Sequence, residues 1–263
     1  MKATILGANG FIGSNLTEVM RKLGYDIYTP LRDDQKLFEE PLGCVFYCIG
    51  LTADFRLRPY DTIDAHICLL RKILEQADYD TMIYLSSTRV YSSSKHTVED
   101  QMISVNPSAP DQLYNISKLM GENLTLSIGR KGRVARLSNV TGKGMGSDNF
   151  LGSLIDDAEK TGRVHIHTSQ NSSKDYIWIN DVTKALIALA QADADSITNI
   201  ASGKNITHAE IAKWFQSRGI VTSFEQNASL VKHPMINIDR LRSLIGVSPD
   251  SLLQHIDELF TNL

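Results

Sequence analysis

Two residues that could move a proton, Tyr114 and Lys118, stand four positions apart in the segment QLYNISKLMGENLTL. Residues four apart share one face of a helix, so the amine would lie beside the phenol. A neighbouring cation favours the phenolate and lowers the pKa of the phenol, which would let Tyr114 exchange a proton near neutral pH. The same spacing also arises by chance on ordinary amphipathic helices, so the rest of the chain has to decide between catalysis and a surface pair.

The N-terminal segment ATILGANGFIG carries glycines at a spacing that suits a phosphate group. Gly7, Gly10 and Gly13 lie between a predicted strand over residues 2–8 and a predicted helix over residues 10–24. A phosphate can approach the backbone only where side chains are absent, and the helix N-terminus offers free N–H groups. Tight packing alone could also explain the glycines, but the strand–glycine–helix order favours a dinucleotide site.

The second predicted strand, YDIYTPL, ends next to Arg32, Asp33 and Asp34. In many dinucleotide folds an acidic residue here accepts hydrogen bonds from the adenosine ribose. Arg32 could instead pair with a 2′-phosphate through its charge and planar fork, which favours NADP over NAD. The alternative is a surface arginine that pairs with the two aspartates.

Short apolar runs alternate with helical patterns through the first two thirds of the chain. This order predicts an α/β fold, a Rossmann-type doubly wound parallel sheet with helices on both faces. After Asn139 the sequence pattern changes, beginning with the glycine-rich segment TGKGMGSDN. We therefore divide the chain into a dinucleotide-binding domain, residues 1–138, and a mixed region, residues 139–263. The mixed region is expected to complete the sheet and to form a small C-terminal substrate lobe, with Thr207 and Glu210 as a helix capping box.

Composition excludes several classes of function. The 263 residues carry a formal net charge of -3, so no strong field points to nucleic acid or to an acidic membrane. No apolar run approaches a membrane span, and the N-terminus does not read as a signal peptide, so a cytoplasmic protein is expected. His165 and His167 would share one strand face, but without a nearby partner in the sequence they predict no metal site.

Six segments together resemble the extended short-chain dehydrogenases/reductases, specifically the NAD-dependent epimerase/dehydratase branch that modifies nucleotide sugars. The resemblance covers most of the chain, and the segments occur in the order of the family pattern. They are GANGFIG, YLSSTRVY, YNISK, RLSNVTG, KDYIWINDVTKAL and TNIASGKNIT.

The resemblance implies roles for individual residues. It makes Tyr114 the acid/base, Lys118 the group that lowers its pKa and holds the nicotinamide ribose, and Ser87 the partner of the substrate oxygen. We expect the Tyr114 and Ser87 hydroxyls to lie together in an open cleft, with the Lys118 amine on the cofactor side. The other residues expected to bind the NADP or NAD cofactor are Gly7, Asn9, Gly10, Phe11, Ile12, Gly13, Arg32, Cys48, Ile49 and Gly50. Those expected to bind substrate are Ser87, Thr88, Asn139 and Lys174.

Several positions depart from the family pattern. Family dehydratases carry an acidic pair where this chain has Thr88 and Arg89, which argues against a 4,6-dehydratase. His66 stands where an asparagine is usual and could support the active site, although simple packing in the helix is favoured. The stretch between Arg32 and Cys44 is short, so the third strand of the family is expected to be missing or vestigial.

These residues favour an NAD(P)-dependent oxidoreductase that acts on a sugar, expected to be nucleotide-linked, as a C4 epimerase or a 4-keto reductase. Two alternatives stay open. One is a cofactor-sensing binding protein without chemistry, and the other is a reductase of small non-sugar carbonyls. A homodimer is also expected, because the family commonly pairs the two helices predicted near residues 60–77 and 112–128. Their apolar positions are Ile67, Leu70, Leu74, Ile116, Met120 and Leu124.

Overall fold

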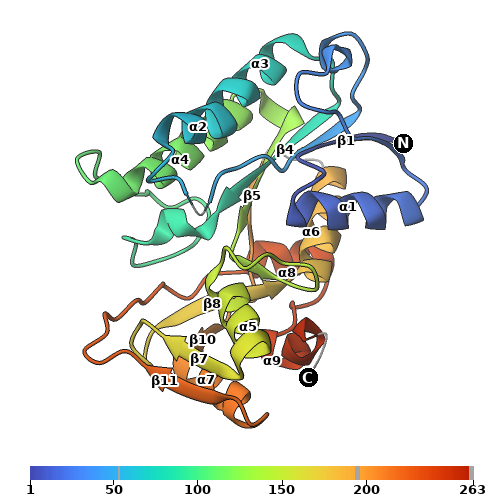
Figure 1. Ribbon diagram of the computed structural model, residues 1–263. Helices are drawn as coiled ribbons and strands as arrows, with labels where there is room; N and C mark the ends of the chain where they lie inside the picture. Colours follow the sequence, from blue (N-terminus) through green and yellow to red (C-terminus); the bar gives the residue numbers. More distant parts are fainter. Residues whose placement is uncertain (53, 193–195, 261–263) are drawn as a thin grey trace.

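The computed structural model describes residues 1–52, 54–192 and 196–260. The chain forms a six-stranded sheet that is flanked by helices, and a smaller lobe lies at one end of this sheet (Figure 1). The sheet order is β2-β1-β3-β4-β5-β9, and every neighbouring pair is parallel. The strands are β1 (Lys2–Leu6), β2 (Asp26–Tyr28), β3 (Cys44–Tyr47), β4 (Thr81–Ser87), β5 (Gly132–Leu137) and β9 (Ser196–Ile200).

This order contains a reversal between β1 and β3. The chain moves outward from β1 to β2 and then returns to place β3 on the other side of β1. In parallel α/β sheets, ligands bind outside the carboxyl ends of the strands at such a reversal. The predicted Rossmann-type fold class is therefore confirmed, and β2 is the edge strand. A short 3₁₀ turn, η1 (Gln35–Phe38), occupies the stretch where the family's third strand was expected to be missing.

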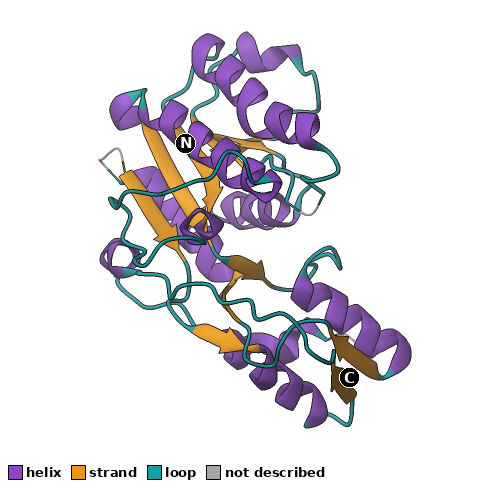
Figure 2. Ribbon diagram, turned by 90° about the vertical axis from the view of Figure 1, so that its left-hand side faces the viewer, coloured by secondary structure: helices purple, strands orange, loops and turns teal. Residues whose placement is uncertain are grey.

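Helices cover both faces of the sheet, and Figure 2 shows its strands between two helical layers. Alternate residues of β3 point to opposite faces: Phe46 packs in one core cluster and Tyr47 in the other. One face is covered by α1 (Phe11–Lys22), α6 (Ile179–Gln191) and α8 (Asp239–Ile245). The opposite face is covered by α2 (Pro59–Ile63), the π-helical turn η2 (Asp64–Cys68), α3 (Leu69–Gln76) and α4 (Leu113–Leu126).

The smaller lobe has its own hydrophobic core, to which Leu154, Trp178 and Phe215 contribute. Its three-stranded sheet has the order β10-β8-β6, and β7 and β11 form a separate parallel pair. The strands are β6 (Asn139–Thr141), β7 (Arg163–Ile166), β8 (Ser173–Trp178), β10 (Asn205–Thr207) and β11 (Val221–Phe224). The helices are α5 (Phe150–Thr161), α7 (His208–Gln216) and α9 (Leu252–His255).

Strand β8 belongs to both hydrophobic cores. Ile177 points into the core beneath the large sheet, whereas Tyr176 and Trp178 on either side of it point into the lobe core. The later part of the chain also supplies β9 and α6 to the large sheet. The division at residues 138 and 139 therefore remains our interpretation, since the two parts interleave.

A buried ion pair ties α4 to the sheet. The Arg136 guanidinium on β5 donates to both carboxylate oxygens of Glu122 on α4, at 3.0 and 2.6 Å, and both side chains are almost fully buried. The Ser86 hydroxyl on β4 also donates to Glu122, and the third guanidinium nitrogen of Arg136, Nη1, donates to the Tyr91 hydroxyl at 2.6 Å. Leaving one partner of such a pair alone typically costs about 3–5 kcal/mol, so α4 is fixed in register against the sheet.

Most predicted elements are present, with shifts at their ends. The capping box of Thr207 and Glu210 is confirmed at the start of α7. The helix expected near residues 60–77 is interrupted by η2, and β11 and α8 were not expected from the sequence. No helix within the described ranges is long and apolar enough to cross a membrane.

Candidate functional site

The side chains expected to be catalytic meet at the carboxyl edge of the large sheet. Ser87 is the last residue of β4, and its hydroxyl accepts a hydrogen bond from the Arg89 backbone N–H in the following 3₁₀ turn, η3 (Thr88–Tyr91). Tyr114 lies in the first turn of α4, which packs beside β4, and Ser87 lies close enough to its hydroxyl to oppose the effect of burial on the pKa of the phenol. The expected proximity of these two hydroxyls is therefore present, although 27 sequence positions separate them.

Tyr114 is more enclosed than we expected. It is only 5% exposed, and its ring packs against Phe55, with 5.4 Å between ring centroids, and beneath the Arg89 guanidinium at 5.3 Å. Phe55 lies in the loop before α2 and is itself 1% exposed. The expectation of an open cleft around the Tyr114 hydroxyl is therefore wrong for this structure, because Phe55 and Arg89 cover the ring.

The pKa of Tyr114 also differs from the expectation. Burial raises the pKa of the phenol, and the opposing effects of the Ser87 hydrogen bond and the Arg89 charge do not reverse that direction. The resemblance assigned the lowering effect to Lys118, whose amine lies 6.0 Å from the centroid of the Tyr114 ring. In this structure the charge that acts on Tyr114 is that of Arg89, a residue that we had noted only as a departure from the family pattern.

Lys118 is a buried amine at the junction of α4, β3 and β4. Its Nζ donates to the Leu85 carbonyl at 2.9 Å, and burial lowers the pKa of Lys118 to about 7, against the opposing charge of Glu122. A Cβ added to Gly50 would lie 3.3 Å from Nζ, so the end of β3 approaches the amine closely. An amine with this pKa can change its protonation state near neutral pH.

The segments expected to bind the cofactor lie next to Lys118 in space. Gly7 has a φ of +82°, and a Cβ there would lie 3.1 Å from the Cys48 backbone and 3.2 Å from the Ile49 side chain. A Cβ on Gly13 would lie 2.2 Å from the Gly7 carbonyl oxygen, so the turn closes tightly. The glycine turn, the end of β3 and Lys118 therefore line one path along the edge of the sheet.

The start of α1 fits a phosphate group. Gly10 is the N-cap residue, no side chain caps the helix there, and both Asn9 and Gly10 are exposed. A helix N-terminus without a side-chain cap leaves backbone N–H donors for an anion. Phe11 and Ile12 are half-buried behind the turn, and Arg32 is exposed on the loop after β2, outside every ion pair found among the described residues. These residues fit a dinucleotide, while their role as ligands stays a prediction.

Three of the residues expected to bind substrate lie on the lobe side of Tyr114. Thr88 is half-buried in η3. Asn139 on β6 is exposed, and its side-chain amide donates to the Asp175 carbonyl on β8 at 2.7 Å. Lys174, next to Asp175, is half-buried, and its amine lies 5.0 Å from the centroid of the Phe150 ring. Asn139 thus holds the strand that carries Lys174.

Lys174 belongs to a group of basic side chains that sequence reasoning did not assemble. We define the cation cluster as Arg89, Lys174 and His233. Burial lowers the pKa of Lys174, and the charge of Arg89 lowers it further. Burial also lowers the pKa of His233, and both Lys174 and Arg89 contribute in the same direction. Within the described part of the chain, neither Arg89 nor Lys174 takes part in an ion pair, so the cluster is suited to an anion.

His66 connects the segment after β3 with helix α4. It is fully buried in η2, a π-helical turn, which is a feature frequent at functional sites. The Leu51 N–H donates to His66 Nε2 at 3.1 Å, so the neutral ring carries its proton on Nδ1 and donates to Ser117 Oγ at 2.8 Å. The Ser117 hydroxyl in turn donates to the Tyr114 carbonyl at 2.9 Å. His66 therefore does more than fill space in the helix.

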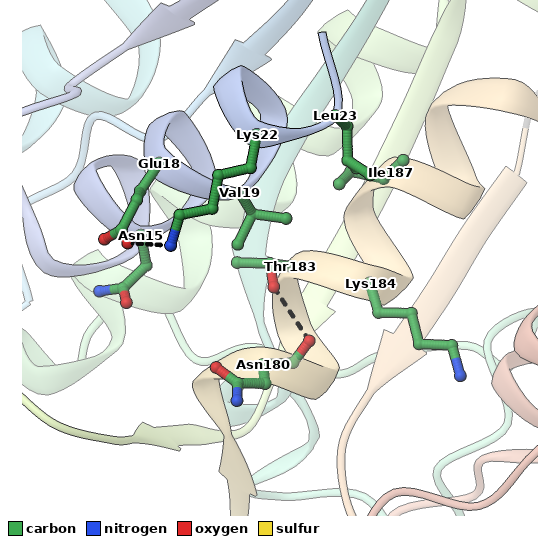
Figure 3. A pocket seen from close by; sticks show the side chains of 9 residues that line it. All are labelled: Asn15, Glu18, Val19, Lys22, Leu23, Asn180, Thr183, Lys184 and Ile187. Atoms are coloured by element: carbon green, nitrogen blue, oxygen red, sulfur yellow. Dashed lines mark hydrogen bonds and ion pairs between the residues drawn. The ribbon is translucent and has the colours of Figure 1, made fainter. Parts of the chain in front are cut away.

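One surface hollow is not part of this site. It lies between α1 and α6, has a volume of 510 Å³, and includes Glu18, Lys22 and Thr183 in its lining (Figure 3). Lys22 is paired with Glu18, and the Thr183 hydroxyl donates to a carbonyl of its own helix. None of the expected catalytic or substrate-binding residues lines it.

Comparison with known proteins agrees with this description. The model of the NAD dependent epimerase/dehydratase family matches residues 3–201. No curated protein matches the sequence. A solved UDP-glucuronic acid 4-epimerase from Bacillus cereus, in complex with UDP-glucuronic acid and NAD, superposes with a TM-score of 0.81 at 17% identity, covering 98% of this chain and 97% of that one.

Two further solved structures are similar over nearly the whole chain. MoeE5 in complex with UDP-glucuronic acid and NAD has a TM-score of 0.80 at 20% identity, covering 97% of this chain and 95% of its own. TunA, described as an NAD dependent NDP-hexosamine 5,6-dehydratase of tunicamycin biosynthesis, has a TM-score of 0.81 at 18% identity, covering 95% and 92%. At these identities the similarity establishes a shared fold.

The burial of His66 predicts a pH-dependent stability. Burial and the charge of Lys118 lower the pKa of His66 from 6.5 to about 3. The unfolded chain therefore binds a proton here that the folded chain does not, and stability falls as the pH drops from about 6.5 toward 3. The substitution His66→Asn should reduce the slope of the unfolding free energy against pH by at most about 1.4 kcal/mol per pH unit, as measured by urea unfolding.

The exposed His96 provides the matched control, since His96→Asn should leave the slope as it is in the wild type. A wild-type slope retained in His66→Asn between pH 6.5 and 4 would contradict the buried neutral imidazole.

Proposed function

The chain belongs to the NAD-dependent epimerase/dehydratase family, and we propose that it is an NAD(P)-dependent enzyme that acts on a nucleotide-linked sugar. Within that class we propose the reaction of a C4 epimerase or of a 4-keto reductase. The observation that carries the proposal is the proximity of Ser87 and Tyr114, with Arg89 of the cation cluster over the Tyr114 ring. Ser87 and Tyr114 can move a proton on a sugar hydroxyl, and the cation cluster can hold an anionic substrate.

The proton-transfer part rests on Tyr114 and Ser87. In the proposed reaction the Tyr114 phenolate would accept the proton of a sugar hydroxyl as the carbon loses a hydride, and the phenol would return the proton when the carbonyl is reduced. The Ser87 hydroxyl, which lies beside Tyr114, would bond to the same substrate oxygen. For this exchange the Phe55 and Arg89 side chains have to leave room beside the Tyr114 ring, since both now cover it.

Lys118 and the glycine turn support a dinucleotide in this role. A bound nicotinamide cofactor would supply the hydride acceptor and donor, which the side chains of the protein cannot provide. Lys118 lies at the end of β3, between the Gly7 turn and Tyr114, so its amine is suited to hold a ribose hydroxyl. The neighbouring solved structures contain NAD, which supports a nicotinamide dinucleotide in the corresponding place.

The cation cluster supports an anionic, nucleotide-linked substrate. Two cations that lie half-buried without carboxylate partners are costly unless an anion compensates them, and a diphosphate would do so. The neighbouring solved structures hold UDP-glucuronic acid or UDP-glucose, whose diphosphates carry such charge. Arg89 lies over Tyr114 and close enough to affect Lys174 electrostatically, so it links the anion region with the reacting end.

Two other functions are less well supported. A binding protein that only senses the cofactor would not need a serine close to a tyrosine beside a lysine with a pKa of about 7. A reductase of small neutral carbonyls would not need the cation cluster. The presence of Arg89 in place of a family carboxylate continues to argue against a 4,6-dehydratase.

We predict that two substitutions separate catalysis from substrate binding. Tyr114→Phe keeps the ring but removes the transferable proton, so turnover of a UDP-sugar should fall by roughly 10²–10⁴-fold with nearly unchanged cofactor affinity. Lys174→Met removes one charge from the anion region, so KM should rise about ten- to a hundredfold with kcat little changed. A screen of UDP- and dTDP-sugars with NAD and NADP, followed by steady-state kinetics on the best substrate, measures both effects.

The exposed Lys213 on α7 is the matched control, because Lys213→Met removes the same charge outside the cation cluster. If Tyr114→Phe lost thermal stability but kept its turnover per folded molecule, Tyr114 would be a packing residue and the proposed chemistry would be wrong.

We further propose that Arg32 gives the enzyme a preference for NADP. Arg32 is exposed after β2, near the expected place of the adenosine ribose, and a 2′-phosphate needs a cation there. Arg32→Ala should weaken NADP binding about tenfold or more and leave NAD binding nearly unchanged, as measured by titration calorimetry. Equal affinities of the wild type for NAD and NADP would show that Arg32 does not give the enzyme a preference for NADP.

A homodimer through α3 and α4 remains part of the proposal in a narrower form. Ile67 and Leu70 lie in the protein interior, so they are not available to a partner as the sequence analysis assumed. Met120 is 49% exposed, and Leu74 and Ile116 are half-buried, which leaves an apolar strip for a second copy. We expect light scattering to give a dimer mass at micromolar concentration, and Met120→Lys to shift it toward the monomer. A monomer mass for the wild type would refute the dimer.

A further inference from the structure

Two histidines and a glutamate that lie apart in the sequence come together on one face of the smaller lobe. Strands β7 and β11 pair in parallel with His165 opposite Ser223. Val164 and Ile166, on either side of His165, are buried in the lobe core, so His165 points outward. His167 follows two residues after His165, and Glu225 follows two residues after Ser223. Strand alternation therefore directs all three side chains to the same exposed face.

The distances between their ligand atoms suit a metal ion. Glu225 Oε2 lies 3.1 Å from His165 Nε2 and 3.4 Å from His167 Nδ1, and the three ligand atoms lie within 4.8 Å of one another. In a tetrahedral zinc site with bonds of about 2.0–2.1 Å, neighbouring ligand atoms are about 3.3–3.4 Å apart. Only the third edge, between the two histidines, has to adjust. Their rings are 4.7 Å apart and exposed, so they are free to make that adjustment.

The surroundings orient the first histidine for this role. His165 Nδ1 lies 2.8 Å from Ser223 Oγ, which can accept a hydrogen bond from the Nδ1–H group. The lone pair of the neutral ring is then on Nε2, the atom that faces Glu225. Metal-binding histidines commonly use their second nitrogen in this way, and the partner fixes both the tautomer and the ring orientation.

We propose that His165, His167 and Glu225 bind one divalent transition-metal ion, Zn²⁺ or a cation of similar preference, with water completing the coordination. Two imidazoles and a carboxylate are a donor set that Zn²⁺ accepts readily. The ion links β7 and β11, which form a sheet of only two strands, and so stabilises the smaller lobe. The site is separate from Ser87, Tyr114 and Lys118, and its function does not depend on the reaction proposed above.

The competing explanation is that the three side chains form surface ion pairs only. Hydrogen bonds from His165 and His167 lower the pKa of Glu225, as such pairs would. Exposed ion pairs contribute little to stability. The two explanations differ in a measurable way, because ion pairs need no metal and should not select for a particular cation.

Metal titration of the full-length protein tests the proposal. The protein is stripped with a chelator, dialysed, and titrated with Zn²⁺ in competition with a chromophoric chelator, with Co²⁺ absorption as a second probe. We expect one ion per chain, a micromolar or lower Kd, visible bands of tetrahedral Co²⁺, and a rise in Tm when Zn²⁺ is added. The double variant H165Q/H167Q should lose all four properties, and circular dichroism shows whether it is folded.

Two further variants make the test specific. Ser223→Ala keeps every ligand atom but removes the partner of Nδ1, so Zn²⁺ affinity should fall about 10–100-fold. His96→Gln, an exposed histidine outside the cluster, should bind Zn²⁺ like the wild type. Equal Zn²⁺ affinity and stoichiometry in the wild type and in H165Q/H167Q would overturn the proposal, as would the absence of Zn²⁺ binding to the wild type.

Discussion

The buried ion pair of Glu122 and Arg136 is the interaction on which the geometry of the candidate active site depends. It joins the middle of α4 to β5, and the Ser86 hydroxyl adds β4 to the same carboxylate. Tyr114 lies two turns before Glu122 on this helix and Lys118 one turn before it, so their positions over the sheet follow from this one contact. Ser87, the next residue after Ser86, is thereby held near the Tyr114 hydroxyl.

The same ion pair extends into the rest of the molecule. Arg136 also donates to the Tyr91 hydroxyl, which donates to the Asn199 side chain on β9 at 2.9 Å. The Asn199 amide donates to the Thr97 and Asn237 carbonyls, so the loops near β9 belong to one network. The charge of Glu122 favours protonated Lys118 against the effect of burial. One carboxylate thus serves both the packing of α4 and the electrostatics of the site.

The candidate site unites two regions with opposite electrostatic needs. On the side of the glycine turn, burial lowers the pKa of His66 to about 3 and that of Lys118 to about 7, which suits hydrogen bonding and proton exchange near pH 7. On the lobe side, burial lowers the pKa of Arg89 and of Lys174, and neither side chain takes part in an ion pair within the described ranges, which suits an anion. Tyr114 lies between the two regions, and its packing against Phe55 means that ligand entry requires rearrangement of side chains.

The sequence by itself determined the features that depend on local periodicity. The strand–glycine–helix pattern around Gly7 and the shared face of Tyr114 and Lys118 follow from the fixed geometry of strands and helices, and the alternation of elements determined the parallel sheet. The tertiary structure alone decided which distant residues meet. It placed Phe55 and Arg89 over Tyr114, joined His66 to Leu51 and Ser117, and brought Glu225 to His165. Those contacts depend on strand register and on loop paths. Burial also reversed the expected direction of the Tyr114 pKa shift. The sequence could not predict this, because no short stretch of it contains the neighbours that exclude water from a side chain.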